Sequence, residues 1–268
     1  MERRHEPVKI GIVTIAYNSG NHLAKLIEMA RSSVNQVVFH LFLHSRHTQT
    51  ISVCERFAGD PGVYYYPYCV NRGVSMSWNE GMINAYSDGI DVVLLVNDDI
   101  GFSAGDVDKL AEKALQSRES YIVTCAGFNL RYNQHFPSLG YACFAINPIA
   151  LEKIGCFDEN FFPAYCEDVD YKYRARLAGL MKGNCADTMV YHGGSSTIFS
   201  DPDLRQQNRL THRRNFAYYR LKWGGDIGRE IFKHPFNQTS FGYYISPEQR
   251  HRPYGLNYDR TDQDIVKV

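Results

Sequence analysis

Two nearly unbroken runs of apolar, mostly β-branched residues constrain the fold of this chain more than any other feature. The first run extends from Val8 to Ile15 and the second from Val92 to Val96. Strands of a parallel sheet have this composition, because helices cover both of their faces. Segments with helical periodicity alternate with strand-like segments along the chain. The sequence therefore predicts an α/β fold with a mostly parallel central sheet flanked by helices.

The other expected elements fill most of the chain up to residue 225. Further strands are expected at residues 37–43, 63–66, 121–125, 141–146 and 188–191. A turn is expected at residues 17–21. Helices are expected at about residues 22–31, 50–57, 75–86, 106–116, 167–180 and 202–219, and one more begins at Asn147-Pro148. No internal repeat or Gly/Ser linker divides the chain. We therefore expect one domain at residues 1–225 and an irregular extension at residues 226–268 that packs on it.

The composition disfavours some classes of protein. Lys+Arg and Asp+Glu number 29 each, so the formal net charge is zero, whereas proteins that bind nucleic acid through bulk electrostatics usually have a basic excess. The 7 Cys are scattered and form no Cys-x-x-Cys pair, which favours reduced thiols over a zinc site or a disulfide framework. The start lacks the apolar core of a signal peptide, and no stretch reaches the ~20 apolar residues of a membrane span. We therefore expect a cytoplasmic protein without a transmembrane segment.

Two carboxylates, Asp98 and Asp99, follow Asn97 at the end of the apolar run that finishes at Val96. Carboxylates at the mouth of a buried strand are costly unless a cation or a ligand compensates their charge. Oxygen ligands favour Mg or Mn, and both ions use substrate phosphates to complete their coordination shells. The alternative is that one of these aspartates only caps a turn before Gly101.

A second acidic cluster and one histidine are further candidates. Glu167 and Asp168 begin a predicted helix, where the helix dipole favours negative charge, so the cluster is explained by structure alone. A carboxylate beside an acceptor hydroxyl can also serve as a general base. His192 ends a predicted strand before two glycines, where a neutral ring nitrogen could reach a metal.

The motifs of several enzyme classes are missing from the chain. No Gly-x-Gly-x-x-Gly follows the first strand, which disfavours a dinucleotide-binding dehydrogenase, and there is no Walker A sequence. The segment Gly73-Val74-Ser75-Met76-Ser77 lacks the last glycine of a hydrolase nucleophile elbow.

Five segments carry a resemblance to a known family. They read IGIVTIAYN, NRGVSMSWNEGMINA, VVLLVNDDIGF, IGCFDENFFPAYCEDVDYKYRARLAG and YHGGSS, and they extend from Val8 to about Gly225. In their order and spacing the chain resembles the inverting family 2 glycosyltransferases of GT-A fold, especially the rhamnosyltransferase-like branch. The resemblance implies a single Rossmann-like GT-A domain with a donor half at about residues 1–125 and an acceptor half at about residues 126–225.

The resemblance also implies a function. It implies an inverting hexosyltransferase of polysaccharide biosynthesis that uses Mn or Mg and a UDP-, TDP- or GDP-sugar and modifies a hydroxyl of a glycan. Asp99 would bind the metal at the donor diphosphate, and His192 would complete the metal site or touch the diphosphate. Asp168 would be the catalytic base, with Glu167 beside it. The nucleotide-sugar would contact Ala16, Tyr17, Asn18, Asn71, Gly73, Asn79, Asn97 and Asp98, although Asn79 could equally be a packing residue inside a helix.

Two positions depart from the family pattern. The family commonly has acidic residues after its second strand, but residues 42–47 of this chain read FLHSRH, so the identity of the base is open. The metal triplet begins with Asn97 instead of Asp, which predicts a looser dependence on metal.

Two other functions remain open on the sequence alone. A sugar nucleotidyltransferase should have a basic, Gly-rich triphosphate loop after the first strand, and residues 16–20 contain no Arg or Lys. A non-catalytic glycan-binding or scaffold protein could keep the fold and lose the chemistry. The sequence does not predict the sugar, the acceptor, the linkage or the oligomeric state.

Overall fold

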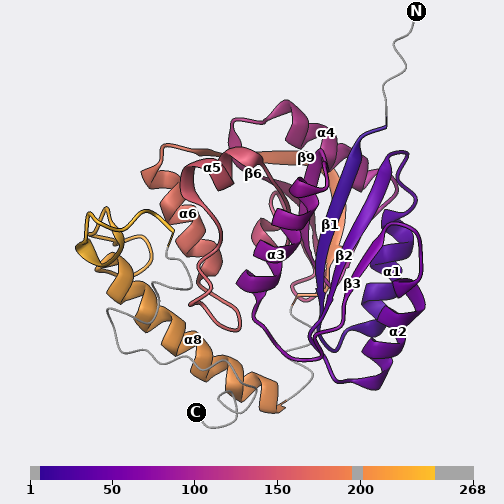
Figure 1. Ribbon diagram of the computed structural model, residues 1–268, viewed down its shortest axis with the longest axis horizontal. Coiled ribbons are helices and arrows are strands. Elements are labelled where there is room, and N and C mark those ends of the chain that lie inside the picture. The colour runs from indigo at the N-terminus through magenta and orange to yellow at the C-terminus, as the bar shows by residue number, and fades with distance from the viewer. Residues whose placement is uncertain (1–6, 195–201, 245–268) are drawn as a thin grey trace, which may run out of the picture.

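A mixed β-sheet crosses the centre of the molecule and determines where the polar strand ends meet (Figure 1). The structure is a computed structural model that describes residues 7–194 and 202–244. Within these residues the strand order is β3-β2-β1-β4-β8-β6-β9-β5, and β7 pairs with β6. The strands are β1 (Lys9–Ala16), β2 (Gln36–Leu43), β3 (Val63–Tyr66), β4 (Val92–Asn97), β5 (Ile100–Gly101), β6 (Ser120–Asn129), β7 (Gln134–Phe136), β8 (Cys143–Ile146) and β9 (Met181–His192).

The first half of the sheet is parallel and the second half is mixed. Strands β3, β2, β1 and β4 all run in the same direction. Strand β8 pairs antiparallel with both β4 and β6, and β9 then pairs parallel with β6. Because the first four strands are parallel, their carboxyl ends meet at one edge of the sheet.

The helices cover both faces of the sheet (Figure 1). One core lies beneath α1 (Gly20–Ala30), α2 (Thr48–Ala58) and α4 (Asp106–Gln116). The other lies beneath α3 (Val74–Ser87), α5 (Pro148–Ile154) and α6 (Glu167–Leu177). A third cluster joins α6 to α8 (Pro202–Trp223), around the fully buried Trp223. Two short 3₁₀ helices also occur, η1 (Gly140–Ala142) and η2 (Pro235–Asn237).

A glycine allows α3 to approach the sheet closely. A Cβ atom at Gly81 would lie only 2.4 Å from a methyl group of Val13 on β1. Any larger side chain at this position would push α3 away from the sheet. The residues before α3 are therefore held near the carboxyl ends of the strands.

The predicted α/β fold with its central sheet and flanking helices is confirmed, and the differences are local. The strand expected at residues 188–191 is longer, because its first part, from Met181, pairs with β6. The helix that begins at Glu167 ends at Leu177 instead of residue 180. The segment 141–146 divides into η1 and β8, and the short strands β5 and β7 were not expected. Asp201, the residue before the last expected helix, lies outside the described residues.

The described residues after α8 contact α6 and α8. Tyr173 on α6 donates a hydrogen bond of 2.7 Å to the carbonyl of Phe232. Glu230 accepts one from Tyr219 on α8 at 2.7 Å and forms an ion pair with Arg176. Residues 245–268 of the expected extension lie outside the described residues. In the described part of the chain, no helix is long and apolar enough to span a membrane.

Candidate functional site

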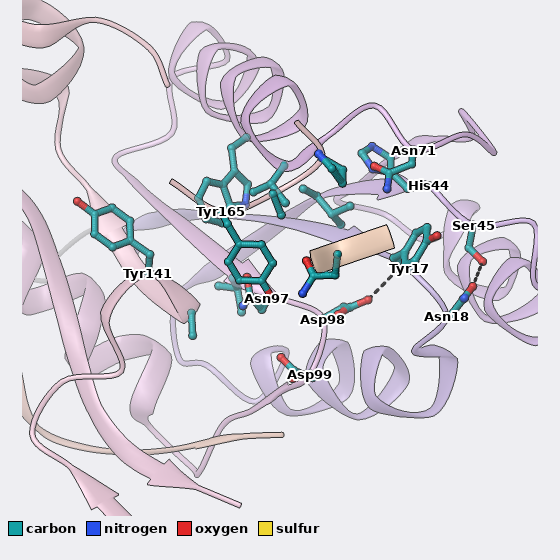
Figure 2. Close-up of a pocket in the computed structure, with 18 of the residues that line it drawn as sticks. Tyr17, Asn18, His44, Ser45, Asn71, Asn97, Asp98, Asp99, Tyr141 and Tyr165 are labelled. Atoms are coloured by element: carbon teal, nitrogen blue, oxygen red, sulfur yellow. Dashed lines mark hydrogen bonds between the residues drawn. The ribbon is translucent and has the colours of Figure 1, made fainter. Parts of the chain in front are cut away.

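A cavity of about 840 Å³ opens at the carboxyl ends of the parallel strands (Figure 2). One side, which we call the strand-end wall, consists of residues at or after the ends of β1 to β4: Ile15, Tyr17, Asn18, His44, Ser45, Arg46, His47, Cys69, Asn71, Val96, Asn97, Asp98 and Asp99. Another side, which we call the helix wall, comes from the loop before α6, from α6 and from α8: Pro163, Ala164, Tyr165, Glu167, Asp168, Asn208 and Thr211. The cavity therefore lies where ligands bind in open α/β sheets.

Asp98 ties the first loop of the strand-end wall to the end of β4. Its Oδ2 atom accepts a hydrogen bond of 2.8 Å from the backbone N–H of Tyr17 and a second one from the Ser19 hydroxyl. Burial raises the pKa of Asp98 to about 7, and the nearby Asp99 carboxylate also raises it, whereas the two hydrogen bonds oppose the shift. Asp98 therefore supports the shape of this wall.

Asn18 belongs to the same loop and has an uncommon backbone conformation. Its φ angle is 58°, in the left-handed region that asparagine tolerates better than most residues. Its Oδ1 atom accepts a hydrogen bond of 2.5 Å from the Ser45 hydroxyl. This bond connects the loops that follow β1 and β2, so both loops line the cavity as one unit.

Asp99 and His192 both line the cavity and lie next to each other. The Nε2 atom of His192 lies 3.4 Å from Oδ1 of Asp99. They come together because β5 pairs with β9, with Ile100 opposite His192. In residues 7–194 and 202–244 no group of three or more His, Cys, Asp or Glu is arranged to hold a metal. The observed arrangement is a carboxylate and an imidazole at the cavity.

Asn129 determines which ring nitrogen of His192 carries the proton. The Oδ1 atom of Asn129 accepts hydrogen bonds from the backbone N–H groups of Arg131 and Tyr132, at 3.1 and 3.2 Å. Its Nδ2 group therefore faces Nδ1 of His192, at 3.3 Å, as a donor. In the neutral ring this contact assigns the proton to Nε2, on the side of Asp99.

Glu167 and Asp168 bring two further carboxyl groups to the cavity, at the start of α6. Burial raises the pKa of both carboxyl groups, and that of Glu167 lies well above its usual range because the Asp168 charge adds to the effect. Glu167 is 7% exposed, and its Oε2 atom has no hydrogen-bond partner among the described residues. Asp168 accepts a hydrogen bond of 2.8 Å from the backbone N–H of Val169. Both residues line the cavity, and the buried Oε2 atom of Glu167 keeps a hydrogen-bonding capacity that no described residue uses.

The loop before α6 is held by α8. Tyr165 and Cys166 both have positive φ angles, 74° and 73°, which is uncommon for consecutive residues other than glycine. The fully buried Asn215 of α8 donates hydrogen bonds to the carbonyls of Ala164 and Tyr165, at 2.8 and 3.0 Å. Arg214 donates another, of 2.7 Å, to the carbonyl of Phe162. These contacts stabilise the backbone that directs Tyr165 into the cavity.

A buried ion network fixes α6 against α8. Lys222 on α8 lies 2.7 Å from Asp158 and 2.7 Å from Asp170, and all three side chains are fully buried. Burial of Asp158 disfavours its negative charge and raises its pKa. The positive charge of Lys222 outweighs this effect, so the pKa of Asp158 lies below its ordinary value. Asp170 also forms a buried ion pair of 2.8 Å with Arg174, within α6. The network positions the first turn of α6, which carries Glu167 and Asp168.

The structure brings most of the predicted site residues to the cavity. Those that line it are Tyr17, Asn18, Asn71, Asn97, Asp98, Asp99, Glu167, Asp168 and His192. Ala16 is fully buried at the end of β1, and its carbonyl accepts a hydrogen bond of 3.1 Å from the backbone of His44. It is not among the lining residues.

Gly73 and Asn79 also lie behind the cavity lining. A Cβ atom at Gly73, where φ is 83°, would lie 2.8 Å from the ring of Phe162. The amide of Asn79 both donates to and accepts from the backbone of Phe157, at 2.9 Å in each case. Asn79 therefore joins α3 to the segment before α6, which agrees with its alternative interpretation as a packing residue.

Several lining residues were not expected from the sequence. His44, Ser45 and Arg46 follow β2, so the rule that ligands bind at strand ends could have identified them. His44 is buried and within 2.7 Å of the Ser77 hydroxyl. Its pKa falls to about 3 because of burial and because of the Arg72 charge, so its ring is neutral at physiological pH. Tyr141, Tyr165, Asn208 and Thr211 have no comparable local signal.

Comparison with known proteins identifies the fold as that of glycosyltransferases. Staphylococcus aureus TarS superposes with a TM-score of 0.56 at 13% identity, over 80% of this chain and 40% of TarS. The mannosyltransferase PcManGT from Pyrobaculum calidifontis, solved with GDP-Man and Mn²⁺, gives 0.55 at 13% identity, over 80% of this chain and 64% of that chain. A structure of TarS residues 1–349 with UDP-GlcNAc gives 0.56 at 14% identity, over 76% of this chain and 65% of that chain.

Sequence comparison finds a relative of the same class. A galactofuranosyl glycosyltransferase from Leishmania donovani is 46% identical over an alignment of 120 residues, which covers 37% of this chain and 27% of the relative. The chain thus spans only about a quarter of this curated relative's length. No family model matches the chain. The chain has a GT-A-like glycosyltransferase fold and sequence similarity to a glycosyltransferase.

Proposed function

We propose that this chain is a glycosyltransferase that moves a hexosyl group from a nucleoside-diphosphate sugar to a hydroxyl of a glycan acceptor, with inversion at the anomeric carbon. One observation carries the proposal. A single cavity at the strand ends contains both the Asp99–His192 pair and the Glu167–Asp168 pair. The Asp99–His192 pair would bind the leaving diphosphate, and the Glu167–Asp168 pair would bind the incoming hydroxyl.

The donor diphosphate and a divalent cation would bind at Asp99. The pair of Asp99 and His192 lacks the third protein ligand of a closed metal cage in the described residues. Mg and Mn commonly bind through one or two carboxylates and complete their shells with water and substrate phosphates, so the residues fit such an ion. When bound, the cation would act as a Lewis acid that stabilises the negative charge on the diphosphate.

His192 would touch the diphosphate directly. Metal-ligating histidines usually donate their other ring N–H to a carboxylate, a carbonyl or water. In this site the other ring nitrogen faces the Nδ2 donor of Asn129, 3.3 Å away. This contact favours a proton on Nε2, which suits a hydrogen bond to a phosphate oxygen better than it suits a metal. The resemblance implies that His192 either completes the metal site or touches the diphosphate, and we therefore propose that it touches the diphosphate.

Asp168 would accept the proton of the acceptor hydroxyl. The acceptor oxygen forms a bond to the anomeric carbon while the bond from that carbon to the diphosphate oxygen breaks. The nucleoside diphosphate leaves with the electron pair, and the proton passes to Asp168. A raised pKa makes this carboxylate a better base. Glu167, whose pKa burial raises well above its usual range, would lie beside Asp168 as a second carboxyl group.

Uridine is the base that we propose for the donor. The part of the strand-end wall after β2 and β3 offers His44, Ser45, Arg46 and Asn71, so neutral or basic groups would contact the base in this region. TarS, which shares the fold, has been solved with UDP-GlcNAc, and the Leishmania relative is named for galactofuranosyl transfer. Together these support UDP-galactofuranose as the first donor to test, ahead of TDP- and GDP-sugars.

We assign the donor half of the domain to about residues 1–125 and the acceptor half to about residues 126–225. We also propose that the chain belongs to the family 2 glycosyltransferases.

Thermal unfolding with nucleotides would test the donor site. The protein is heated with UDP, TDP or GDP, each with Mn²⁺ or with a chelator. A ligand at 100 times its Kd stabilises a fold by about 2.7 kcal/mol, which is readily measured as a rise in Tm. We expect stabilisation by UDP that requires metal and is lost in Asp99→Ala but kept in Asp88→Ala, an exposed control.

Two results would contradict the proposal. If no diphosphate stabilises the protein, a non-catalytic glycan-binding role becomes the better explanation. If UDP stabilises Asp99→Ala as strongly as the unaltered protein, Asp99 does not bind the metal–diphosphate group.

A further inference from the structure

The helix wall contains an aromatic ring that the proposed chemistry does not use. Tyr165 lines the cavity two residues before Glu167 and three before Asp168. Figure 2 shows its ring between Tyr141 and Tyr17 as the cavity is viewed. The side chain is only partly buried, so one part of it faces the cavity.

The backbone of Tyr165 is held in an unfavourable conformation. Residues in the left-handed region other than glycine cost free energy and are commonly found at ligand sites. At Tyr165 and Cys166 the conformation is maintained by the hydrogen bonds from Asn215. The ring also packs against His212, whose ring centroid lies 5.3 Å away at an interplanar angle of 84°. The ring is therefore fixed before any ligand binds.

Polar side chains lie on α8 beside this ring. Asn208 and Thr211 line the same cavity, and they are separated by nearly one helical turn. Thr211 is 7% exposed, and its hydroxyl donates a hydrogen bond of 3.2 Å to the carbonyl of Asn208. A fixed aromatic face with an amide and a hydroxyl beside it matches the two kinds of surface on a sugar ring, the C–H face and the hydroxyl groups.

We propose that Tyr165, Asn208 and Thr211 form a subsite for a sugar ring of the acceptor, with Tyr165 as the stacking platform. This inference rests on the proposed function, and it names the residues that would bind the sugar ring of the acceptor. The acceptor is a glycoside whose sugar ring lies on Tyr165 while its hydroxyl points to Asp168. A hydroxyl carried by a peptide or an alkyl chain would not use this surface.

Binding of simple glycosides would test the subsite without catalysis. Saturation-transfer NMR is recorded with methyl β-D-galactofuranoside and methyl α-D-mannopyranoside on the unaltered protein and three variants. We expect at least one glycoside to bind the unaltered protein and Tyr165→Phe, which keeps the ring. Tyr165→Ala should weaken binding by about tenfold, equivalent to 1.4 kcal/mol. Tyr64→Ala, an exposed tyrosine on the edge strand β3, is the control that should bind normally.

The outcomes separate the subsite from the proposed function. Equal binding by Tyr165→Ala and the unaltered protein, or no binding of either glycoside, would overturn the subsite. Glycoside binding that depends on Tyr165, in a protein that no nucleotide stabilises, would support the subsite and refute the transferase. In transfer assays, Tyr165→Ala should raise the acceptor KM far more than the donor KM, and an equal rise in both would also overturn the assignment.

Discussion

The strand-end wall and the helix wall of the cavity are constructed in different ways. Residues of the strand-end wall, such as Tyr17 and Asp98, follow strands directly and owe their positions to the parallel pairing of β1 with β4. The helix wall depends on partners about 50 residues away in α8, because Asn215 donates a hydrogen bond to the carbonyl of Tyr165 and Trp223 donates one to Asp170, two residues after Asp168. The first wall is a property of the sheet, whereas the second is a property of the packing between α6 and α8.

This difference has a consequence for function. In the proposed mechanism the strand-end wall binds the nucleotide, which has to be recognised in the same way whatever the acceptor. The helix wall binds the acceptor and provides the base. Its construction from a loop and a separate helix would allow acceptor specificity to change without disturbing the sheet.

The largest effect is expected from Asp168→Asn, which removes the base from the helix wall. General-base assistance is commonly worth about 10²–10⁴-fold, so the transfer rate should fall by that factor. Asn can still accept the hydrogen bond from Val169, and the Tm should not fall. UDP binding to the strand-end wall should be unchanged. A transfer assay and a thermal scan on the same preparation give both values.

The pH dependence of the transfer rate of the unaltered protein is a second test of Asp168 as the base. Because burial raises the pKa of Asp168, the base loses its charge at a higher pH than an ordinary aspartate. The acid limb of kcat/KM should therefore lie above pH 3.8, the ordinary value for Asp. An Asp168→Asn protein with an unchanged rate and the same acid limb would show that another group is the base.

The next largest effect is expected from Lys222→Met, which leaves Asp158 and Asp170 with one cation fewer. Removing one partner of a buried ion pair commonly costs about 3–5 kcal/mol. The matched control is Arg220→Met on the same helix, because the Arg220–Asp226 pair is exposed and such pairs contribute about 0–1 kcal/mol. Chemical denaturation measures the free energy of unfolding of both variants. Equal losses in the two variants would mean that the buried network does not hold the helix wall in place.

The smallest effect is expected from His192→Gln. The Gln amide can donate a hydrogen bond to the diphosphate, so we expect a loss of about tenfold or less in transfer rate, the size of one hydrogen bond. The Mn²⁺ concentration that gives half-maximal activity should not change. His192→Ala, which has no donor, should be slower than His192→Gln. A clear rise in the Mn²⁺ requirement of His192→Gln would show instead that His192 is a metal ligand.

The two walls also differ in how far the sequence predicts them. Val92 to Val96 has the pattern of a buried strand, and the position of Asp98 and Asp99 at the cavity follows from the chemistry of strand ends. Glu167 and Asp168 were predicted from a resemblance, since acidic residues at a helix start have an ordinary structural explanation. Tyr165 and Thr211 were missed, because their positions depend on the contact between the 162–166 loop and α8. No local pattern reports such a contact.

The most direct test of the proposed function is transfer itself. The unaltered protein is incubated with UDP-galactofuranose, Mn²⁺ and the glycoside that binds best, and the product is analysed by mass spectrometry and NMR. We expect a product heavier by one hexosyl residue whose new linkage has the opposite anomeric configuration to the donor, and about 10²–10⁴-fold slower formation of it by Asp168→Asn. A product with retained configuration would contradict the single displacement with an Asp168 base. If TDP- and GDP-sugars are also tried and no product forms from any donor, the transferase assignment is wrong.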